Sequence, residues 1–507
     1  MTSSSRNSSL GNLSISRASS KIAGQMTNLL TSEPESDFVC SKSWWMRLAC
    51  IGLPFYKEHE GKRYCVLHFP GKEKSSDFEK AFKGKLKNKD FNFSGVWFPD
   101  RLSCLNYHFD GYVTFSSATF SAEANFYSAT FDEEANFSRA TFSANAIFAD
   151  ATFSAEANFR DITLSGCAEF MGARFTAATD FTNARFTEAD FSNDSFGGAV
   201  RFNLARFGRP ARFANASFGG VAEFGLARFS EGADFESTTF SAAADFLYAD
   251  FSAVAYFGEA TFRDYVKFAG SESGAMFDGA TLDLQFARIE KPDHLSFHTL
   301  RLRPHWFVNV DARRFSFTNI HWGPASTDKE VMSLRGTSVS SPHDLMAIAY
   351  RNLAVNAEEN QRYEEASKFR FMAMDARRRE KWRGFAIWRL SWWYWLASGY
   401  GERAGQAFGV LLGIFLLSAL LYSQVGFVRW EPKLASESDA AVAARDGIGK
   451  PLPLSRALAY SAAVITFQKP EPRPATMPAQ VVVLFETILG PIQAALLALA
   501  IRRKFMR

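Results

Sequence analysis

The 507-residue sequence is long enough for several domains, and its 47% hydrophobic and 22% charged content is ordinary for a globular or membrane-attached protein. The net charge of +4 conceals an acidic stretch, because residues 111–290 carry 24 Asp or Glu against 12 Lys or Arg. The five cysteines are odd in number, and no apolar stretch that could serve as a signal peptide follows the first basic residues, so we expect a reducing, cytoplasmic setting for most of the chain.

The N-terminal region divides into a tail and a small cap. Residues 1–36 are rich in Ser and Asn without a sustained apolar period, which predicts a disordered tail. Residues 37–90 contain enough aromatic residues for a folded cap. The cap also holds four potential zinc ligands, namely Cys40, Cys50, Cys65 and His68. Cys65 and His68 have zinc-knuckle spacing, whereas Cys40 and Cys50 are farther apart than usual, so both a structural zinc site and a purely structural role stay open.

Phenylalanine is used with a fixed spacing after this cap. The sequence has 52 Phe against 14 Tyr and 11 Trp. From Phe93 to Phe268 most of them form a lattice, with Cys104 and Leu164 at two of its sites, whose steps alternate between five and six. The alternation breaks in three consecutive steps of five from Phe181 to Phe196. Of the thirty lattice sites from Phe120 to Leu282, twenty-four have Ala two positions earlier. Composition and spacing together indicate an internal repeat.

These spacings are typical of strands. Residues i−2 and i lie on the same side of an extended segment, so each Ala-x-Phe unit turns one small and one large side chain inward. A helix would scatter the Phe side chains around its axis. The predicted core includes Phe115, Phe126, Phe137, Phe148, Phe159, Phe181, Phe213, Phe235 and Phe257.

Units such as ATFSA, ANFYS, ARFTE and ADFSN resemble the pentapeptide-repeat family. The resemblance implies a right-handed quadrilateral β-helix with four repeats in each coil. Four repeats span 22 residues here, so we expect one extra residue at alternate corners and about eight and a half coils between Phe93 and Leu282. The predicted fold is therefore mainly β over residues 91–322, followed by a linker at 323–340 and a C-terminal α-helical membrane domain.

A helical juxtamembrane region is predicted at 341–403. Ser341 and Pro342 have the residue types of a helix N-cap and first helical position, and we expect helices near 343–357 and 361–380. Trp residues between 382 and 395 lie close to Arg, a combination typical of a bilayer interface. The same Trp residues would also suit an aromatic core for the two helices.

Two transmembrane helices are predicted, at 404–430 and within 481–507. Residues 407–428 carry no charge, and residues 481–501 carry only Glu486, so each is long enough to cross about 30 Å of hydrocarbon. Basic residues precede the first span and follow the second. The positive-inside rule therefore favours both termini in the cytoplasm and the loop at 431–480 outside, and we expect the chain in the inner membrane.

A shorter apolar segment, 452–467, lies between the spans and has the length of a re-entrant helix. The order span, short helix, span resembles the two-transmembrane ion-channel modules that follow pentapeptide repeats in some bacterial proteins. The stretches 400–403, 460–461 and 486–505 carry this resemblance. It implies a pore, formed by several subunits and tetrameric if family-like, with the candidate residues Thr466, Phe467, Gln468 and Glu486. Thr466-Phe467-Gln468 departs from the Thr-x-Gly-Tyr-Gly filter that potassium selectivity needs, and Glu486 would also be compatible with a plain anchor.

No catalytic triad, His-Glu-x-x-His motif or Gly-rich phosphate loop is present, so we do not expect an enzyme. Three functions remain. The first is a membrane-anchored scaffold or sensor whose cytoplasmic β-helix binds a protein partner. The second is an oligomeric ion channel or membrane-permeabilising effector gated by the repeats. The third is a DNA-mimicking protein that binds topoisomerases, which the acidic excess favours but which surface arginines such as Arg201 and Arg212 and the membrane tether oppose; nucleic acid is not an expected partner.

Overall fold

The structure is a computed structural model that describes residues 38–271, 275–277, 279–323, 331–332, 341–380, 390–428 and 450–505. The predictions for the tail at 1–36, most of the linker at 323–340, Trp382, Trp388 and the loop at 431–449 lie outside the described residues. The chain forms two compact units, residues 1–212 and 213–507, which are described separately.

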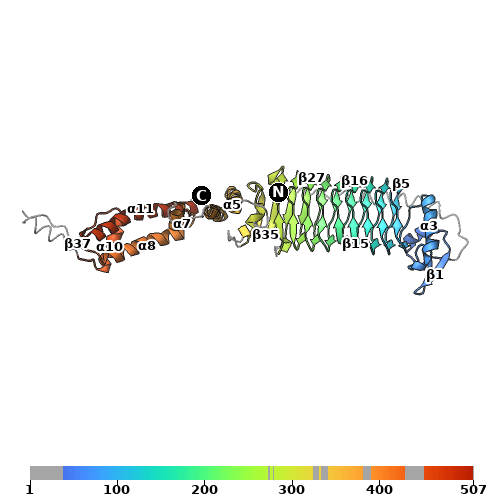
Figure 1. Cartoon of the computed structure of the whole chain (residues 1–507), viewed down its shortest axis with the longest axis horizontal. Helices are drawn as coiled ribbons and strands as arrows, with labels where there is room; N and C mark the ends of the chain where they lie inside the picture. The colour runs from blue at the N-terminus through green and yellow to red at the C-terminus, as the bar shows by residue number, and fades with distance from the viewer. Residues whose placement is uncertain are drawn as a thin grey trace, which may run out of the picture. The chain divides into compact units, whose positions relative to one another are not determined.

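The repeats form a β-solenoid of about ten turns, so the predicted β-solenoid with C-terminal helices is confirmed. Its short strands stack in parallel on successive turns (Figure 1). The coil strands of the first unit are β3 (Trp97–Phe98), β4 (Leu102–Ser103), β5 (His108–Phe109), β6 (Val113–Thr114), β7 (Thr119–Phe120), β8 (Ala124–Asn125), β9 (Thr130–Phe131), β10 (Ala135–Asn136), β11 (Thr141–Phe142), β12 (Ala146–Ile147), β13 (Thr152–Phe153), β14 (Ala157–Asn158), β15 (Thr163–Glu169), β16 (Arg174–Phe175), β17 (Thr179–Asp180), β18 (Arg185–Asp190), β19 (Ser195–Phe196), β20 (Val200–Arg201), β21 (Arg206–Phe207) and β22 (Ala211–Arg212).

The strand register confirms the predicted coil length. Ala135 pairs with Ala157, so one coil takes 22 residues. Where the sequence has three consecutive steps of five, the coil shortens to 21 residues, because Phe175 pairs with Phe196. In this shortened coil β18 runs straight through a corner, as β15 does in the coil before it, whereas most other coils bend there.

The two kinds of step correspond to two kinds of corner. Most steps of five contain a hydrogen-bonded turn, as in Phe115 to Ala118, where the Ala118 N–H donates to Phe115 O at 2.9 Å and Ser117 has a φ of +56°. Most steps of six contain a bend with one more residue. The Asn or Asp before many lattice Phe residues accepts a bond from the N–H two positions on, as Asn136 Oδ1 does from Ser138 N–H at 2.9 Å. These side chains therefore stabilise the turns instead of only facing water.

The interior consists of stacked phenylalanine rings. Phe126 lies 5.0 Å from Phe148 between ring centroids with an interplanar angle of 4°, and it meets Phe137 edge to face at 5.6 Å. Ala124, two positions before Phe126, is also fully buried. The nine core residues predicted above, from Phe115 to Phe257, are all 0% exposed.

One lattice site in the first unit buries a carboxyl where most sites have Ala. Asp194 is 1% exposed, and its Oδ1 accepts from the Ala173 N–H at 2.9 Å. The same N–H also donates to Phe170 O at 2.7 Å, while Asp194 Oδ2 has no hydrogen-bond partner among the described residues. Burial raises the pKa of the Asp194 carboxyl well above its usual value, against the hydrogen bonds from Ala173 and Gly172.

Replacing Asp194 by alanine is therefore expected to stabilise the chain, and more so at pH 7 than at pH 4. The folded state keeps the carboxyl protonated, so folding becomes less favourable as the pH rises from the unfolded value of about 3.9 towards the raised folded pKa. Denaturation of wild type and variant over pH 4 to 8 would measure the difference. A difference in unfolding free energy between wild type and variant that stays constant from pH 4 to 8 would contradict this account.

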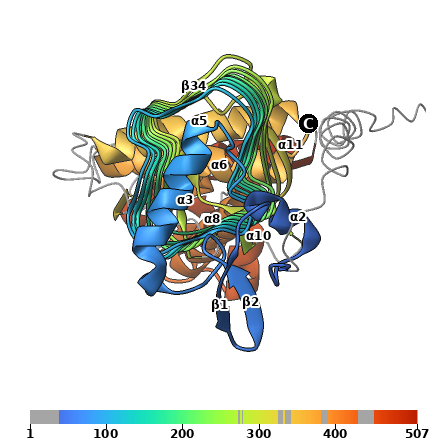
Figure 2. The same cartoon turned by 90° about the vertical axis from the view of Figure 1, so that its right-hand side faces the viewer.

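The N-terminal cap covers the first coil. It consists of α2 (Trp44–Arg47), η1 (Leu48–Cys50), the antiparallel hairpin of β1 (Phe55–His59) and β2 (Lys62–Cys65), η2 (Lys72–Lys74) and α3 (Ser75–Lys87). Phe78 and Phe82 of α3 pack against Phe98 at centroid distances of 5.4 and 5.8 Å. Figure 2, a view down the axis of the solenoid, shows α3 lying across the end of the stacked coils.

The second unit begins with the later coils. Its β and 3-10 elements are β23 (Ser217–Phe218), β24 (Ala222–Glu223), β25 (Arg228–Phe229), β26 (Ala233–Asp234), β27 (Thr239–Phe240), β28 (Ala244–Leu247), β29 (Asp250–Phe251), β30 (Val254–Tyr256), β31 (Thr261–Phe262), β32 (Val266–Ala269), η3 (Ala275–Phe277), β33 (Thr281–Asp283), β34 (Arg288–Ile289), η4 (Pro292–His294), β35 (Leu295–Leu302), η5 (Pro304–Phe307) and β36 (Ser316–Trp322). The last coils lose the 22-residue repeat, since Val266 pairs with Leu295. They nevertheless extend to Trp322, where the β-helix was predicted to end.

Two helices follow, α5 (Pro342–Glu359) and α6 (Tyr363–Glu380), close to the predicted bounds. They pack against the last coil. The buried Asn356 Nδ2 of α5 lies 3.1 Å from Ala312 O and 2.7 Å from Phe315 O, and Trp322 meets Phe369 of α6 edge to face at 5.1 Å. The Asn356 amide therefore donates to backbone carbonyl groups of the last coil, which would otherwise lack partners at the end of the solenoid.

The C-terminal helices are α7 (Leu390–Ser398), α8 (Ala404–Tyr422), α10 (Leu454–Ile465) and α11 (Met477–Phe505). A short antiparallel pair, β37 (Phe427–Val428) and β38 (Arg473–Pro474), joins the segment after α8 to the segment before α11. Within the residues that the structure describes, two helices are long and apolar enough to cross a membrane, α8 and the part of α11 from Met477 to Arg503. The apolar segment predicted at 452–467 contains α10, which packs against both of them.

Candidate functional site

The C-terminal module buries a carboxyl group between its helices. Glu486 lies on α11 and is 1% exposed. Its two oxygens accept hydrogen bonds from the Tyr422 hydroxyl at the end of α8 and from the Ser461 hydroxyl of α10. Ser461 Oγ also lies 3.1 Å from Phe415 O of α8. One side chain of α11 therefore holds all three helices together through hydrogen bonds.

A second buried polar side chain of α11 fixes the other end of the module. Gln493 is 3% exposed, and its Nε2 donates to Ala397 O at 2.6 Å and to Ala407 O at 2.8 Å. Ala397 belongs to α7 and Ala407 to the first turns of α8. Gln493 thus donates hydrogen bonds to backbone carbonyl groups near the end of α7 and the beginning of α8. The outward side chains are apolar, among them Leu412, Leu416, Leu417, Leu484 and Ile488, which are 42 to 59% exposed.

The predicted pore residues after α10 form a helix cap. Thr466 Oγ1 donates to Ala462 O at 2.9 Å, and Phe467 has a φ of +61°. The Gln468 N–H donates to Ala463 O at 2.9 Å, which closes the end of α10 in the manner of a Schellman motif. Phe467 is 71% exposed, while Glu486 is buried between the helices. Pore roles for Thr466, Phe467, Gln468 and Glu486 stay predictions.

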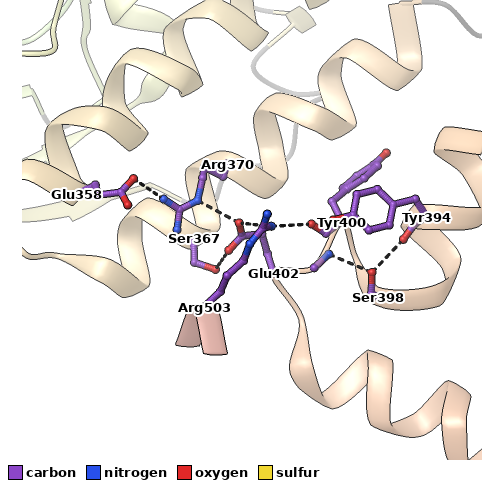
Figure 3. A network of polar contacts seen from close by, with 9 residues as sticks. Glu358, Ser367, Arg370, Tyr394, Ser398, Tyr400, Glu402 and Arg503 are labelled. Carbon is purple, nitrogen blue, oxygen red and sulfur yellow. Dashed lines mark hydrogen bonds and ion pairs between the residues drawn. The ribbon is translucent and has the colours of Figure 1, made fainter. Parts of the chain in front are cut away.

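An ion-pair network joins the α7–α8 loop and α11 to the helices α5 and α6 (Figure 3). Its centre is Glu402, in the loop between α7 and α8, whose side chain is 2% exposed. The Glu402 carboxylate lies 3.0 Å from Arg370 Nε of α6 and 3.3 Å from Arg503 Nη1 of α11, and it accepts from Ser367 Oγ at 2.8 Å. Arg370 also pairs with Glu358 of α5 at 2.6 Å.

The four potential metal ligands of the cap meet in the first unit. The sulfur atoms of Cys40, Cys50 and Cys65 and a ring nitrogen of His68 all lie within 4.8 Å of one another, and all four residues are buried. The loop from Cys40 to Cys50 contains α2 and η1, which fold back and bring the two distant cysteines together. Hydrogen bonds from the Cys50 and Cys65 thiols lower the pKa of the Cys40 thiol.

The comparisons with known proteins bear on the repeats. Residues 115–163 match the family model described as pentapeptide repeats (9 copies). The chain carries pentapeptide repeats. No curated protein and no solved structure matches the chain.

The matched pentapeptide repeats lie in the first unit, from the residue after β6 to the first residue of β15. They supply the core and the turns, whereas the polar clusters around Glu486, Glu402 and Cys40 lie outside the matched residues. Sequence reasoning named Glu486 and the cysteines, but it missed Glu402 as a network centre and Gln493 altogether. Gln493 was visible as a polar residue in an apolar run, a signal similar to that of Glu486.

Proposed function

We propose that this chain is a non-enzymatic, membrane-anchored scaffold. The pentapeptide-repeat solenoid binds a protein partner in the cytoplasm, and α8 and α11 hold it to the inner membrane. The observation that carries the proposal is the polarity of the C-terminal module. Its apolar side chains point outward, while Glu486 and Gln493 are buried and hydrogen-bonded inside. This distribution suits a hydrocarbon solvent, in which every polar group needs an internal partner.

The connection within the second unit supports a scaffold rather than a loosely tethered domain. Asn356 fixes α5 to the last coil, and Glu402 fixes α6 to the ends of α8 and α11. Each link uses a buried side chain with two or more polar partners. The last coil is thus joined to the two apolar helices through defined contacts.

Stacked carboxylates on the solenoid suggest the chemistry of the partner. Glu134 and Glu156 precede the paired residues Ala135 and Ala157, so they lie on neighbouring coils. Burial and the negative charge of Glu156 raise the pKa of Glu134. Like charges in register cost stability, and a basic protein surface would relieve this repulsion. The scaffold therefore favours a partner with exposed Lys or Arg.

Membrane attachment is tested by placing charges on the outward face of the helices. The double variant Leu416→Arg, Leu489→Arg is expected to move much of the full-length chain from the carbonate-resistant membrane fraction to the soluble fraction. Each Arg near the middle of a span costs about 2.5–3.5 kcal/mol on insertion. The matched control is Leu204→Arg, since Leu204 on the solenoid is 46% exposed and Leu416 is 49% exposed. Equal partitioning of both variants and wild type would refute the anchor.

Partner binding is tested with a photo-crosslinking amino acid at Tyr112, which is 41% exposed and interacts electrostatically with Glu134. We expect a discrete adduct in cells that disappears in the background Glu134→Lys, Glu156→Lys. The same probe at Tyr265, which is 59% exposed in the second unit, serves as the control. An adduct that survives the charge reversal would contradict the acidic docking surface.

A channel is the second candidate, favoured by the short helix α10 that packs against both apolar helices. Planar-bilayer recordings of the purified chain discriminate the two functions. The scaffold predicts no ionic current for wild type or Glu486→Gln, because the Glu486 carboxyl is occupied by Tyr422 and Ser461. Currents whose ion selectivity changes in Glu486→Gln would favour the channel instead.

A further inference from the structure

We propose that Cys40, Cys50, Cys65 and His68 bind one structural Zn²⁺ ion that ties the N-terminal cap to the first coil of the solenoid. The four ligand atoms already lie within 4.8 Å of one another. Ideal tetrahedral zinc bonds of about 2.3 Å to sulfur and 2.0 Å to nitrogen place such atoms roughly 3.5–3.8 Å apart. Side-chain movements of about 1 Å or less would therefore complete the coordination. Two of the pairs are close to that geometry, at 3.3 Å from Cys65 Sγ and 3.5 Å from Cys40 Sγ to His68 Nδ1.

The histidine is oriented as a metal ligand. His68 Nε2 lies 3.0 Å from Ser94 O, and a carbonyl oxygen can only accept, so Nε2 carries a hydrogen. The lone pair of Nδ1 in the neutral ring then faces the sulfur atoms. A second hydrogen bond that fixes the tautomer and the ring plane is a regular feature of zinc-binding histidines.

The surroundings supply positive charge for an anionic centre. Three thiolates, one neutral imidazole and Zn²⁺ carry a net charge of −1. Lys74 is 0% exposed, and its Nζ donates to Leu67 O at 2.7 Å and lies 4.7 Å from the Phe78 ring centroid. Within the described part of the chain Lys74 has no ion pair with a carboxylate, but it interacts electrostatically with Cys65, as Lys42 does with Cys40. A zinc–thiolate centre would balance the buried Lys74 and the half-buried Lys42.

The donor set distinguishes zinc from other occupants. Thiolate and imidazole ligands in a tetrahedral arrangement favour zinc over Ca²⁺ or Mg²⁺, which take oxygen ligands. Four protein ligands in a buried site leave no open position, which is the pattern of a structural rather than a catalytic centre. All three cysteines are free thiols, and a disulfide would use only two of them and leave His68 Nδ1 facing the third.

Zinc would connect three parts of the first unit. Cys40 and Cys50 flank α2, Cys65 ends β2, and His68 follows in a turn where its N–H donates to Cys65 O at 3.2 Å. The bond from His68 to Ser94 carries the connection to the first coil. A terminal coil needs such a cap, because its unpaired strand edges and apolar interior would otherwise be open to water.

The zinc content of the full-length chain, purified without added metal, tests this proposal by mass spectrometry of the metal. We expect about one zinc per chain, falling at least fivefold in Cys65→Ser. The matched control Cys104→Ser replaces another buried free thiol outside the cluster and should keep its zinc. Zinc absent from wild type, or equal losses in both variants, would overturn the proposal.

Cobalt substitution tests the site even if Cys65→Ser does not fold. The Co²⁺-exchanged wild type should show the intense visible absorption of a tetrahedral thiolate site and a sulfur-to-cobalt charge-transfer band. His68→Cys should retain the metal and strengthen the charge-transfer band, whereas His68→Ala should bind cobalt more weakly. Six-coordinate, weakly absorbing cobalt in the wild type, or the detection of a disulfide among these cysteines in place of metal, would overturn it.

Discussion

The variant Phe126→Ala is expected to lower the free energy of unfolding by about 3–5 kcal/mol. Phe126 is 0% exposed and stacks on Phe148 at 5.0 Å, with edge-to-face contacts to Phe115 at 5.5 Å and Phe137 at 5.6 Å. Alanine leaves a cavity that the coil cannot close, because the neighbouring rings are held in register by the strands above and below. Denaturant unfolding of the full chain would measure the loss.

The neighbouring residue provides the control. Tyr127 is 41% exposed and carries a ring of similar size on the outside of the same turn. Its backbone N–H bond to Asn125 Oδ1, at 2.9 Å, is kept in Tyr127→Ala. This variant should stay within about 0.5 kcal/mol of wild type. If the two substitutions cost the same, the stacked rings do not carry the stability of the solenoid.

The variant Glu402→Ala is expected to destabilise the second unit by about 3–5 kcal/mol, because it leaves the guanidinium groups of Arg370 and Arg503 without their shared buried partner. The Glu402 side chain is 2% exposed and accepts from both arginines and from Ser367. We also expect faster proteolysis of α5 and α6, which would lose their link to α11. Denaturation and limited proteolysis in detergent micelles measure both effects.

An exposed ion pair of the same unit gives the comparison. Asp311 and Arg313 lie 2.6 Å apart, with side chains 55 and 56% exposed. Because water screens this pair, Asp311→Ala should change the free energy of unfolding by no more than about 1 kcal/mol. An effect of Glu402→Ala no larger than that of Asp311→Ala would show that the network contributes nothing to the junction.

The local order of the chain was determined by the sequence. Steps of five and six between Phe residues, with Ala two positions earlier, define coils of 22 residues, because a period repeated many times allows only one register in which every ring is buried. Even the shortened coil at Phe196 was visible as a break in the count. The apolar lengths around α8 and α11 were equally plain, since they depend on composition alone.

The polar clusters were decided by the tertiary structure. Cys40 and Cys50 are too far apart in sequence for a usual zinc motif, and only the folding of α2 and η1 between them brings their sulfur atoms together. The ion pairs of Glu402 could not be predicted, because its partners Arg370 and Arg503 lie 32 and 101 positions away. The repeated spacing of buried residues can be read directly from neighbouring positions in the sequence. A buried charged side chain, in contrast, pairs with residues of distant segments that come together only when the chain folds.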